Sequence, residues 1–313
     1  AGIPGTDSLR SSDKRFAADL TDLNPAAMIN ERSLRAGLVM PESCTSEFFT
    51  DEAVAIYGEQ GFFLPLRMFA AEGVAELRAH LEAAEARQGS LTGKNRSAKY
   101  HLLMTWLDQL VRHAGILDAV EKLLGPDILC WGTALLIKEP GDGTHVSWHQ
   151  DLNYWGLDPA DVTTAWLALS PATKETGCMR MMAGSHLVHY AHRDTDDPSN
   201  LLSRGQTVAD DLDEAAATYI ELQPGEISLH HGNMAHASGP NSGSERRIGI
   251  AIRYLAAHVR PTDGPDSALL VRGQDRYRNF EAETSPAEDF DPAAMAEHDR
   301  VMALRQAVLM AGV

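Results

Sequence analysis

The sequence predicts a mainly β fold with flanking helices, arranged as a β sandwich or barrel. Three observations predict it. Apolar residues recur at helical spacing from Asp51 to Gly125, short apolar runs separated by turn residues follow Pro126, and a helical pattern returns after Pro292. Because no linker separates the helical front from the strands, we expect a single domain.

Residues 1–45 hold scattered Gly and Pro with weak periodicity, which predicts an extended N-terminal arm. The single domain is expected over residues 46–313, with a helical front at 51–125, a β core at about 126–255 and a C-terminal extension at 261–313.

Helical spacing predicts a helix from Asp51 to the stop at Gly61, a second at Glu72–Arg87 and a third from Leu102 to Gly125. A short buried strand is expected at Phe62–Leu64. Seven further strands are predicted, at Ile128–Ile137, Val146–Asn153, Val162–Leu169, Cys178–Met182, Tyr219–Leu222, Glu226–His230 and Ile248–Tyr254. The chain beyond Arg260 is expected to be irregular until a closing helix after Pro292. The polar stretch 189–217 is an excursion of the kind that often covers a site.

Composition excludes several function classes. The chain carries 27 Lys and Arg against 44 Asp and Glu, a net charge of −17, which argues against nucleic-acid or anionic-membrane binding. No apolar run is long enough to span a membrane. Cys44, Cys130 and Cys178 are far apart, so we expect no disulfide framework and a cytoplasmic location.

The segment Val146–Trp155 carries the chemistry. On a strand, alternate side chains share a face, so His149 and Asp151 point the same way and Gln150 points away. An imidazole and a carboxylate at this spacing can bind one metal ion, and His236 is the leading candidate for a third ligand. Two His and one carboxylate suit a non-haem Fe(II) centre with open positions. By itself such a His–Asp pair is more often a simple hydrogen-bonded pair.

The strand that begins at Arg247 looks like the wall of a cavity. Arg247, Gly249, Ala251 and Arg253 share one face, and the isoleucines between them share the other. Small residues leave room for a ligand beside a guanidinium that can grip a carboxylate. The alternative is that Arg247 makes a surface salt bridge.

Four blocks in order resemble the phytanoyl-CoA dioxygenase (PhyH) family of Fe(II)- and 2-oxoglutarate-dependent oxygenases. They are Trp148–Asp151, Thr164–Leu169, Gly177–His186, and His236–Asn241 followed by Arg247. The resemblance covers about residues 126–255. It implies a double-stranded β-helix (jelly-roll, cupin-like) core that uses Fe(II), 2-oxoglutarate and O₂.

The resemblance also implies roles for single residues. His149, Asp151 and His236 are similar to the family's catalytic iron ligands, Arg247 to the partner of the distal carboxylate of 2-oxoglutarate, and Trp166 to a residue lining the cosubstrate pocket. Family members that halogenate carbon have a small residue in place of the carboxylate ligand. Because Asp151 is present here, hydroxylation is favoured.

We therefore expect a dioxygenase that hydroxylates an unactivated C–H bond of a small molecule and releases succinate and CO₂. An amino acid, compatible solute, phosphonate or natural-product intermediate ranks above an acyl-CoA, because no cluster of Lys and Arg lies near the site to receive the CoA phosphates. Desaturation, epimerisation or ring closure on the same iron, a non-catalytic jelly-roll binding protein, and a zinc hydrolase remain alternatives. The candidate substrate residues are Arg253, Trp148, Tyr154 and Trp155.

Overall fold

The computed structural model describes Gly2 and residues 49–91, 98–202 and 204–311. The predicted arm at 1–45 lies, apart from Gly2, outside the described residues.

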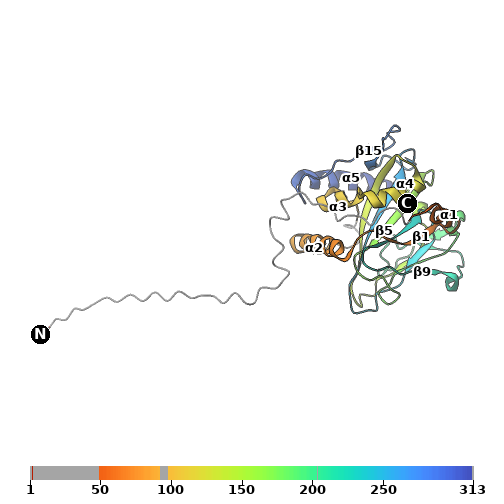
Figure 1. Cartoon of the computed structure of the whole chain (residues 1–313), viewed down its shortest axis with the longest axis horizontal. Coiled ribbons are helices and arrows are strands. Elements are labelled where there is room, and N and C mark those ends of the chain that lie inside the picture. The colour runs from red at the N-terminus through yellow and green to blue at the C-terminus, as the bar shows by residue number, and fades with distance from the viewer. Residues whose placement is uncertain (1, 3–48, 92–97, 203, 312–313) are drawn as a thin grey trace. The chain divides into compact units, whose positions relative to one another are not determined.

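Five α-helices accompany the strands in the described part of the chain (Figure 1): α1 (Asp51–Gln60), α2 (Ala71–Gln88), α3 (Thr105–Val111), α4 (Ala114–Leu124) and α5 (Pro292–Ala311). The first begins where the Thr50 hydroxyl accepts the N–H of Ala53, and it ends at Gly61, whose φ of 86° suits glycine. The helices predicted near Asp51, at Glu72 and after Pro292 are confirmed. The long helix predicted from Leu102 is instead divided into α3 and α4.

Two main sheets form most of the β part of the described chain. The larger has the order β1-β10-β5-β12-β2-β14-β15, where only the β14–β15 pair is parallel, and the smaller has the order β3-β11-β6-β9. Two further sheets have two strands each, β4 (Leu157–Asp158) with β13 (Arg260–Pro261), and β7 (His192–Arg193) with β8 (Thr207–Val208). The large-sheet strands are β1 (Phe62–Arg67), β2 (Ile128–Lys138), β5 (Val162–Ala168), β10 (Glu226–His231), β12 (Arg247–Ala256), β14 (Ser267–Arg272) and β15 (Glu281–Ala282). The small-sheet strands are β3 (Val146–His149), β6 (Met179–Met181), β9 (Thr218–Ile220) and β11 (His236–Ser238). The fold is thus mixed α/β with multistranded antiparallel sheets.

Three strand predictions need correction. The strand predicted at Val146–Asn153 stops at His149, because a 3₁₀ turn, η4 (Asp151–Asn153), follows it. The short strand β11 was not predicted, since three residues are too few to show alternation. Finally, β14 pairs with β2 in a stretch predicted to be irregular.

The two faces of β12 are used as the alternation predicts. Ile248, Ile250 and Ile252 are fully buried on the face that α4 covers. The opposite face, here called the inner face, includes Arg247 and Arg253. Directly opposed residues of neighbouring strands point to the same side, so the register extends the inner face to Ser228 and His230 of β10, Thr164 and Trp166 of β5, and Gly132 and Lys138 of β2.

The excursion 189–217 packs against the small sheet. It contains β7 (His192–Arg193), β8 (Thr207–Val208) and the 3₁₀ turn η6 (Glu214–Ala216). Val208 from β8 joins Trp148 and Ala237 in one buried cluster. Trp148 and Ala237 are the sequence neighbours of His149 and His236, and neighbouring residues of a strand point to opposite faces. The excursion therefore lies on the face of the small sheet opposite the histidines. No described helix is both long and apolar enough to cross a membrane.

Candidate metal and cosubstrate site

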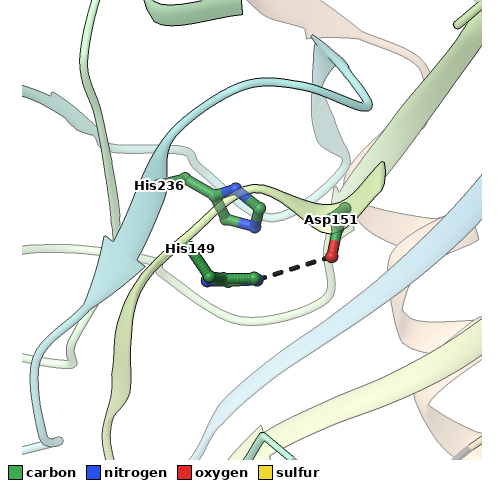
Figure 2. A group of neighbouring side chains, drawn as sticks. All are labelled: His149, Asp151 and His236. Atoms are coloured by element: carbon green, nitrogen blue, oxygen red, sulfur yellow. Dashed lines mark ion pairs between the residues drawn. The ribbon is translucent and has the colours of Figure 1, made fainter. Parts of the chain in front are cut away.

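His149, Asp151 and His236 converge on one point (Figure 2). In the small sheet His236 lies directly opposite His149, and the two ring centres are 4.1 Å apart. Asp151 Oδ1 lies 3.4 Å from His149 Nε2. One ligand atom from each residue lies within 4.8 Å of the others, and no other group of three potential ligands among the described residues meets this criterion. This spacing is suitable for a single metal ion.

Asp151 reaches this point by a different route from the one that strand alternation suggests. It is the first residue of η4, not a strand residue. The turn is fixed from both sides, because Tyr154 N donates to Asp151 O and Leu152 N donates to Gly232 O. His149 and Asp151 therefore converge as expected, but the 3₁₀ turn brings them together and strand alternation does not.

Both imidazoles are oriented by backbone carbonyls. His149 Nδ1 donates to Ser147 O and His236 Nδ1 donates to Met234 O, each at 2.9 Å. Because a carbonyl can only accept, the proton lies on Nδ1 and the lone pair of Nε2 is free for a metal. A ligand imidazole held through its other nitrogen is the usual arrangement in metal sites.

The protonation states also suit a metal. Burial, with help from neighbouring His149, lowers the pKa of His236 to about 4, so this ring is neutral near pH 7. Burial alone would raise the pKa of Asp151. In the acidic range where this carboxyl would titrate, the hydrogen bond with His149 and the positive charges of His236 and Arg253 outweigh burial and hold the pKa of Asp151 below its usual range. Near pH 7 the neutral His236 no longer contributes to this effect. A neutral imidazole and an ionised carboxylate are the forms that bind Fe(II).

The inner face of the large sheet carries a row of buried polar atoms that have no hydrogen-bond partner among the described residues. They are Ser228 Oγ, His230 Nδ1, Thr164 Oγ1, Trp166 Nε1, Arg247 Nε and Arg253 Nε. Buried polar atoms are nearly always paired, so such a row needs an explanation. A polar cosubstrate, a substrate and their water molecules would supply the missing partners, and the residues present therefore fit a metal with an oxygen-rich ligand.

Arg247 is buried on this face without a carboxylate partner among the described residues. One guanidinium nitrogen donates to Gly177 O at 2.6 Å, and the Trp166 ring lies 5.4 Å from the guanidinium carbon. The Trp166 ring can take this position because residue 249 is glycine, since a Cβ there would lie 2.0 Å from the ring. Arg247 is thus not part of a surface salt bridge, and its cation is available to a ligand.

Lys138, a residue that the sequence did not single out, lies opposite Arg247 on the inner face. Its buried ammonium donates to Ser238 Oγ at 2.8 Å and to the Gly239 carbonyl. Burial and, to a smaller extent, the nearby Arg247 charge together lower the pKa of Lys138 to about 7. The sequence did hold a signal for Lys138. This residue ends an apolar strand, and by alternation it shares a face with the small residues of β2.

The four candidate substrate residues are not all together. Arg253 lies on the inner face with its guanidinium 5.0 Å from the Trp155 ring. Trp148 lies on the opposite face of β3 from His149, where Arg180 stacks on it. Tyr154 contacts His192 and Arg204 of the excursion. Trp148 and Tyr154 thus pack against the excursion.

Gln150, His186 and His192 have structural roles. The buried Gln150 amide donates to Val188 O and Asn233 O and accepts from Tyr190 N, which ties the excursion to the β10–β11 turn. His186 contacts Gly58 O, and His192 accepts from the Gln150 N–H.

Comparison with known proteins agrees with this geometry. The family model described as "Phytanoyl-CoA dioxygenase (PhyH)" matches residues 57–249, more than half of the chain. The chain belongs to the phytanoyl-CoA dioxygenase family. This is a family of non-haem Fe(II)- and 2-oxoglutarate-dependent dioxygenases, and the His–Asp–His group is consistent with those cofactors.

Individual members of the family and their structures are also similar. A solved structure described as "non-heme monooxygenase; ThoJ apo" is 39% identical and matches 82% of this chain and 96% of that chain, with a TM-score of 0.71. "CytC3 with Fe(II) and alpha-ketoglutarate" is 25% identical over 80% of this chain and 98% of that one, with a TM-score of 0.60.

The curated relatives match over a shorter length. A "Probable alpha-ketoglutarate-dependent hypophosphite dioxygenase" from Stutzerimonas stutzeri is 30% identical over 182 residues, which are 56% of this chain and 63% of that protein. The chain spans about half of the length of the phytanoyl-CoA dioxygenases that it matches from Caenorhabditis elegans and Homo sapiens.

Proposed function

We propose that this chain is an Fe(II)/2-oxoglutarate-dependent dioxygenase that hydroxylates an unactivated C–H bond of a small organic substrate, on a double-stranded β-helix core. The observation that carries the proposal is the convergence of His149, Asp151 and His236 within 4.8 Å, together with a buried Arg247 on the inner face of the large sheet that has no carboxylate partner among the described residues. A reducing compartment such as the cytoplasm suits the buried thiols of Cys130 and Cys178.

Each residue has a definite task in this proposal. His149 and His236 present Nε2 to the metal, because their Nδ1 protons are held by carbonyls. Asp151 supplies the anionic oxygen. Bound Fe(II) and 2-oxoglutarate supply the chemistry, in which O₂ oxidises a C–H bond while 2-oxoglutarate gives succinate and CO₂.

The protein contributes binding and placement. Arg247 holds the distal carboxylate of 2-oxoglutarate by a charge-assisted hydrogen bond, with its guanidinium positioned by Gly177 O and the Trp166 ring. Trp166 forms one wall of the cosubstrate pocket. The substrate occupies the remaining inner face near Arg253, where aliphatic and aromatic neighbours exclude water.

The substrate class follows from chemistry near the site and from one relative. The Stutzerimonas relative is named for hypophosphite, a small oxyanion. An amino acid, phosphonate or other small acid fits a pocket with cationic side chains better than a neutral lipid. Compatible solutes and natural-product intermediates that carry a carboxylate belong to the same group.

The test is a substrate screen of the Fe(II)-loaded protein with 2-oxoglutarate and O₂, read as substrate-stimulated succinate release. A product 16 Da heavier than its substrate would support hydroxylation, as expected for insertion of one oxygen atom. A product lighter by two hydrogens would instead identify desaturation or ring closure. A product of unchanged mass would identify epimerisation. A protein that binds neither Fe(II) nor 2-oxoglutarate would overturn the proposal.

A further inference from the structure

Two arginines and two tryptophans form a second group next to the triad, which we call the arginine–tryptophan cluster: Arg253, Arg305, Trp131 and Trp155. The guanidinium carbon of Arg253 lies 5.0 Å from the centre of the Trp155 ring, and that of Arg305 lies 4.5 Å from the Trp131 ring. The two indole centres are 4.8 Å apart. The two rings are inclined by 45°, so two cations flank a pair of tilted aromatic walls.

Strand β2 lies beside this cluster. Gly132 lies directly opposite Arg253 in the sheet, and a Cβ on Gly132 would be in ordinary van der Waals contact with Arg305 Nη1, at 3.8 Å. The register between β2 and β12 shifts at this point, so that Trp131 has no direct partner. Such bulges commonly redirect a side chain beside an active site. The bulge in β2 thus sets the direction of the Trp131 side chain in the cluster.

Neither guanidinium has a hydrogen bond or an ion pair with any described residue. The Nε of Arg253 and the Nη1 of Arg305 are buried without a partner. Burying two neighbouring guanidinium groups without a hydrogen-bonded anion is unfavourable. Burial lowers the pKa of both arginines, that of Arg305 to about 10 with a contribution from Arg253, which expresses the same cost.

The carboxylates nearby already have other partners. Asp266 accepts from Trp131 Nε1 at 2.6 Å. Glu283 accepts from Lys99 at 2.6 Å and lies 2.9 Å from a ring nitrogen of His101. Asp151 belongs to the triad. Burial lowers the pKa of Arg253 and the nearby charge of Asp151 partly offsets this, but the two side chains make no ion pair. Arg253 and Arg305 therefore keep unused hydrogen-bond donors, which an anion from outside the chain can occupy.

We propose that Arg253 and Arg305 bind an anionic group of the substrate, a carboxylate, phosphate or phosphonate, with Trp131 and Trp155 as the walls beside it. The inference that this anion belongs to the substrate rests on the proposed function. An anion held here lies next to Asp151, so the rest of the molecule extends toward the metal. Arg305 belongs to α5, so this part of the site comes from outside the β core.

The test uses the Mn(II)-loaded protein, saturated with 2-oxoglutarate under nitrogen, so that Arg247 is occupied and no turnover occurs. Acetate, methylphosphonate and inorganic phosphate are titrated to about 50 mM, with tryptophan fluorescence as the readout. We expect saturable quenching by the anions, and their relative affinities distinguish carboxylate from phosphorus oxyanions. Methyl acetate, which is neutral and similar in shape to acetate, should have no effect.

Arg253→Met and Arg305→Met should each weaken anion binding at least about tenfold, because each removes a charge-assisted hydrogen-bond donor. The matched control is Arg300→Met, which changes an exposed arginine of the same helix that pairs with Glu281 and Glu297. The affinity for 2-oxoglutarate should be unchanged in all three variants.

Equal responses to acetate and methyl acetate in the unaltered protein would overturn the inference, even if a variant failed to fold. Unchanged anion affinity in both folded variants, or a loss of 2-oxoglutarate affinity alone, would do the same. If no 2-oxoglutarate binds but the anions bind in an Arg253- and Arg305-dependent way, the anion site stands and the dioxygenase proposal fails.

Discussion

At the scale of single residues, the candidate site depends on which side chains have a protein partner and which do not. The Asp151 carboxylate contacts only a histidine of the triad, and Arg247 has no carboxylate partner among the described residues. Asp161 and Arg246 belong to the same residue types but are paired at the surface, with His258 and with Glu85 respectively. This pairing gives each candidate residue a matched control from the same chain.

Asp151→Ala should abolish succinate release and weaken Fe(II) binding by at least about 100-fold, since changes to groups that only support ligands already cost 10–100-fold. Metal content after dialysis and succinate release together measure the effect. Asp161→Ala, which breaks an exposed His–Asp pair, should change neither. Full turnover in the Asp151 variant would exclude it as an iron ligand.

Arg247→Met should raise the KM for 2-oxoglutarate by about 10–100-fold, as expected from a loss of roughly 1.5–3 kcal/mol of charge-assisted hydrogen bonding. Metal affinity should be unchanged, because Arg247 does not belong to the triad. Arg246→Met is the control, since that side chain lies one position away and pairs with Glu85 and Glu139. An unaltered KM would assign the carboxylate to another cation, with Lys138 the nearest candidate.

At the scale of elements, the two sheets divide the work. The small sheet holds both histidines on adjacent strands, and the large sheet supplies the cations and Trp166. The fit between β5 and β12 is tight at one position, because the Trp166 ring occupies the space where a side chain at position 249 would begin.

Gly249→Ala should therefore displace Trp166, which costs about 1–3 kcal/mol of unfolding free energy and weakens 2-oxoglutarate binding. Chemical denaturation and a 2-oxoglutarate titration measure the two effects. In the control Gly58→Ala the new Cβ meets no atom within 4 Å in helix α1, so unfolding free energy should rise by about 0.5–1 kcal/mol. A Gly249 variant as stable as the parent would show that Trp166 can move aside freely.

The elements also show where prediction from sequence succeeded and failed. The alternation of Arg247 to Arg253 placed their side chains correctly, because a ten-residue strand has a clear period. Asp151 was expected on a strand and lies in a 3₁₀ turn, whose hydrogen bond to Gly232 joins distant parts of the chain. Arg305 could not be linked to the site at all, since the position of α5 depends on tertiary packing that no local pattern encodes.

At the scale of the whole molecule, the buried cations make stability depend on pH. Burial lowers the pKa of Lys138 to about 7 from a usual value of 10.5. Between these values the unfolded chain binds a proton that the folded chain does not, so the free energy of unfolding rises with pH.

We expect this contribution to reach a few kcal/mol (on the order of 1.4 kcal/mol per pKa unit) between pH 7 and pH 10.5. The measurement is denaturant unfolding across this range without 2-oxoglutarate, in the parent and in Lys138→Met. The variant should lack this part of the pH slope, whatever its absolute stability. Parallel curves for the two proteins would contradict a depressed pKa at Lys138.

The direct opposition of His149 and His236 sets a limit on how the gene can change. Side chains alternate along β11, so sliding this strand by one position against β3 would turn the imidazole of His236 to the other side of the sheet. A residue gained or lost between β10 and β11 would therefore separate the two imidazoles, so the metal site fixes the length of this turn.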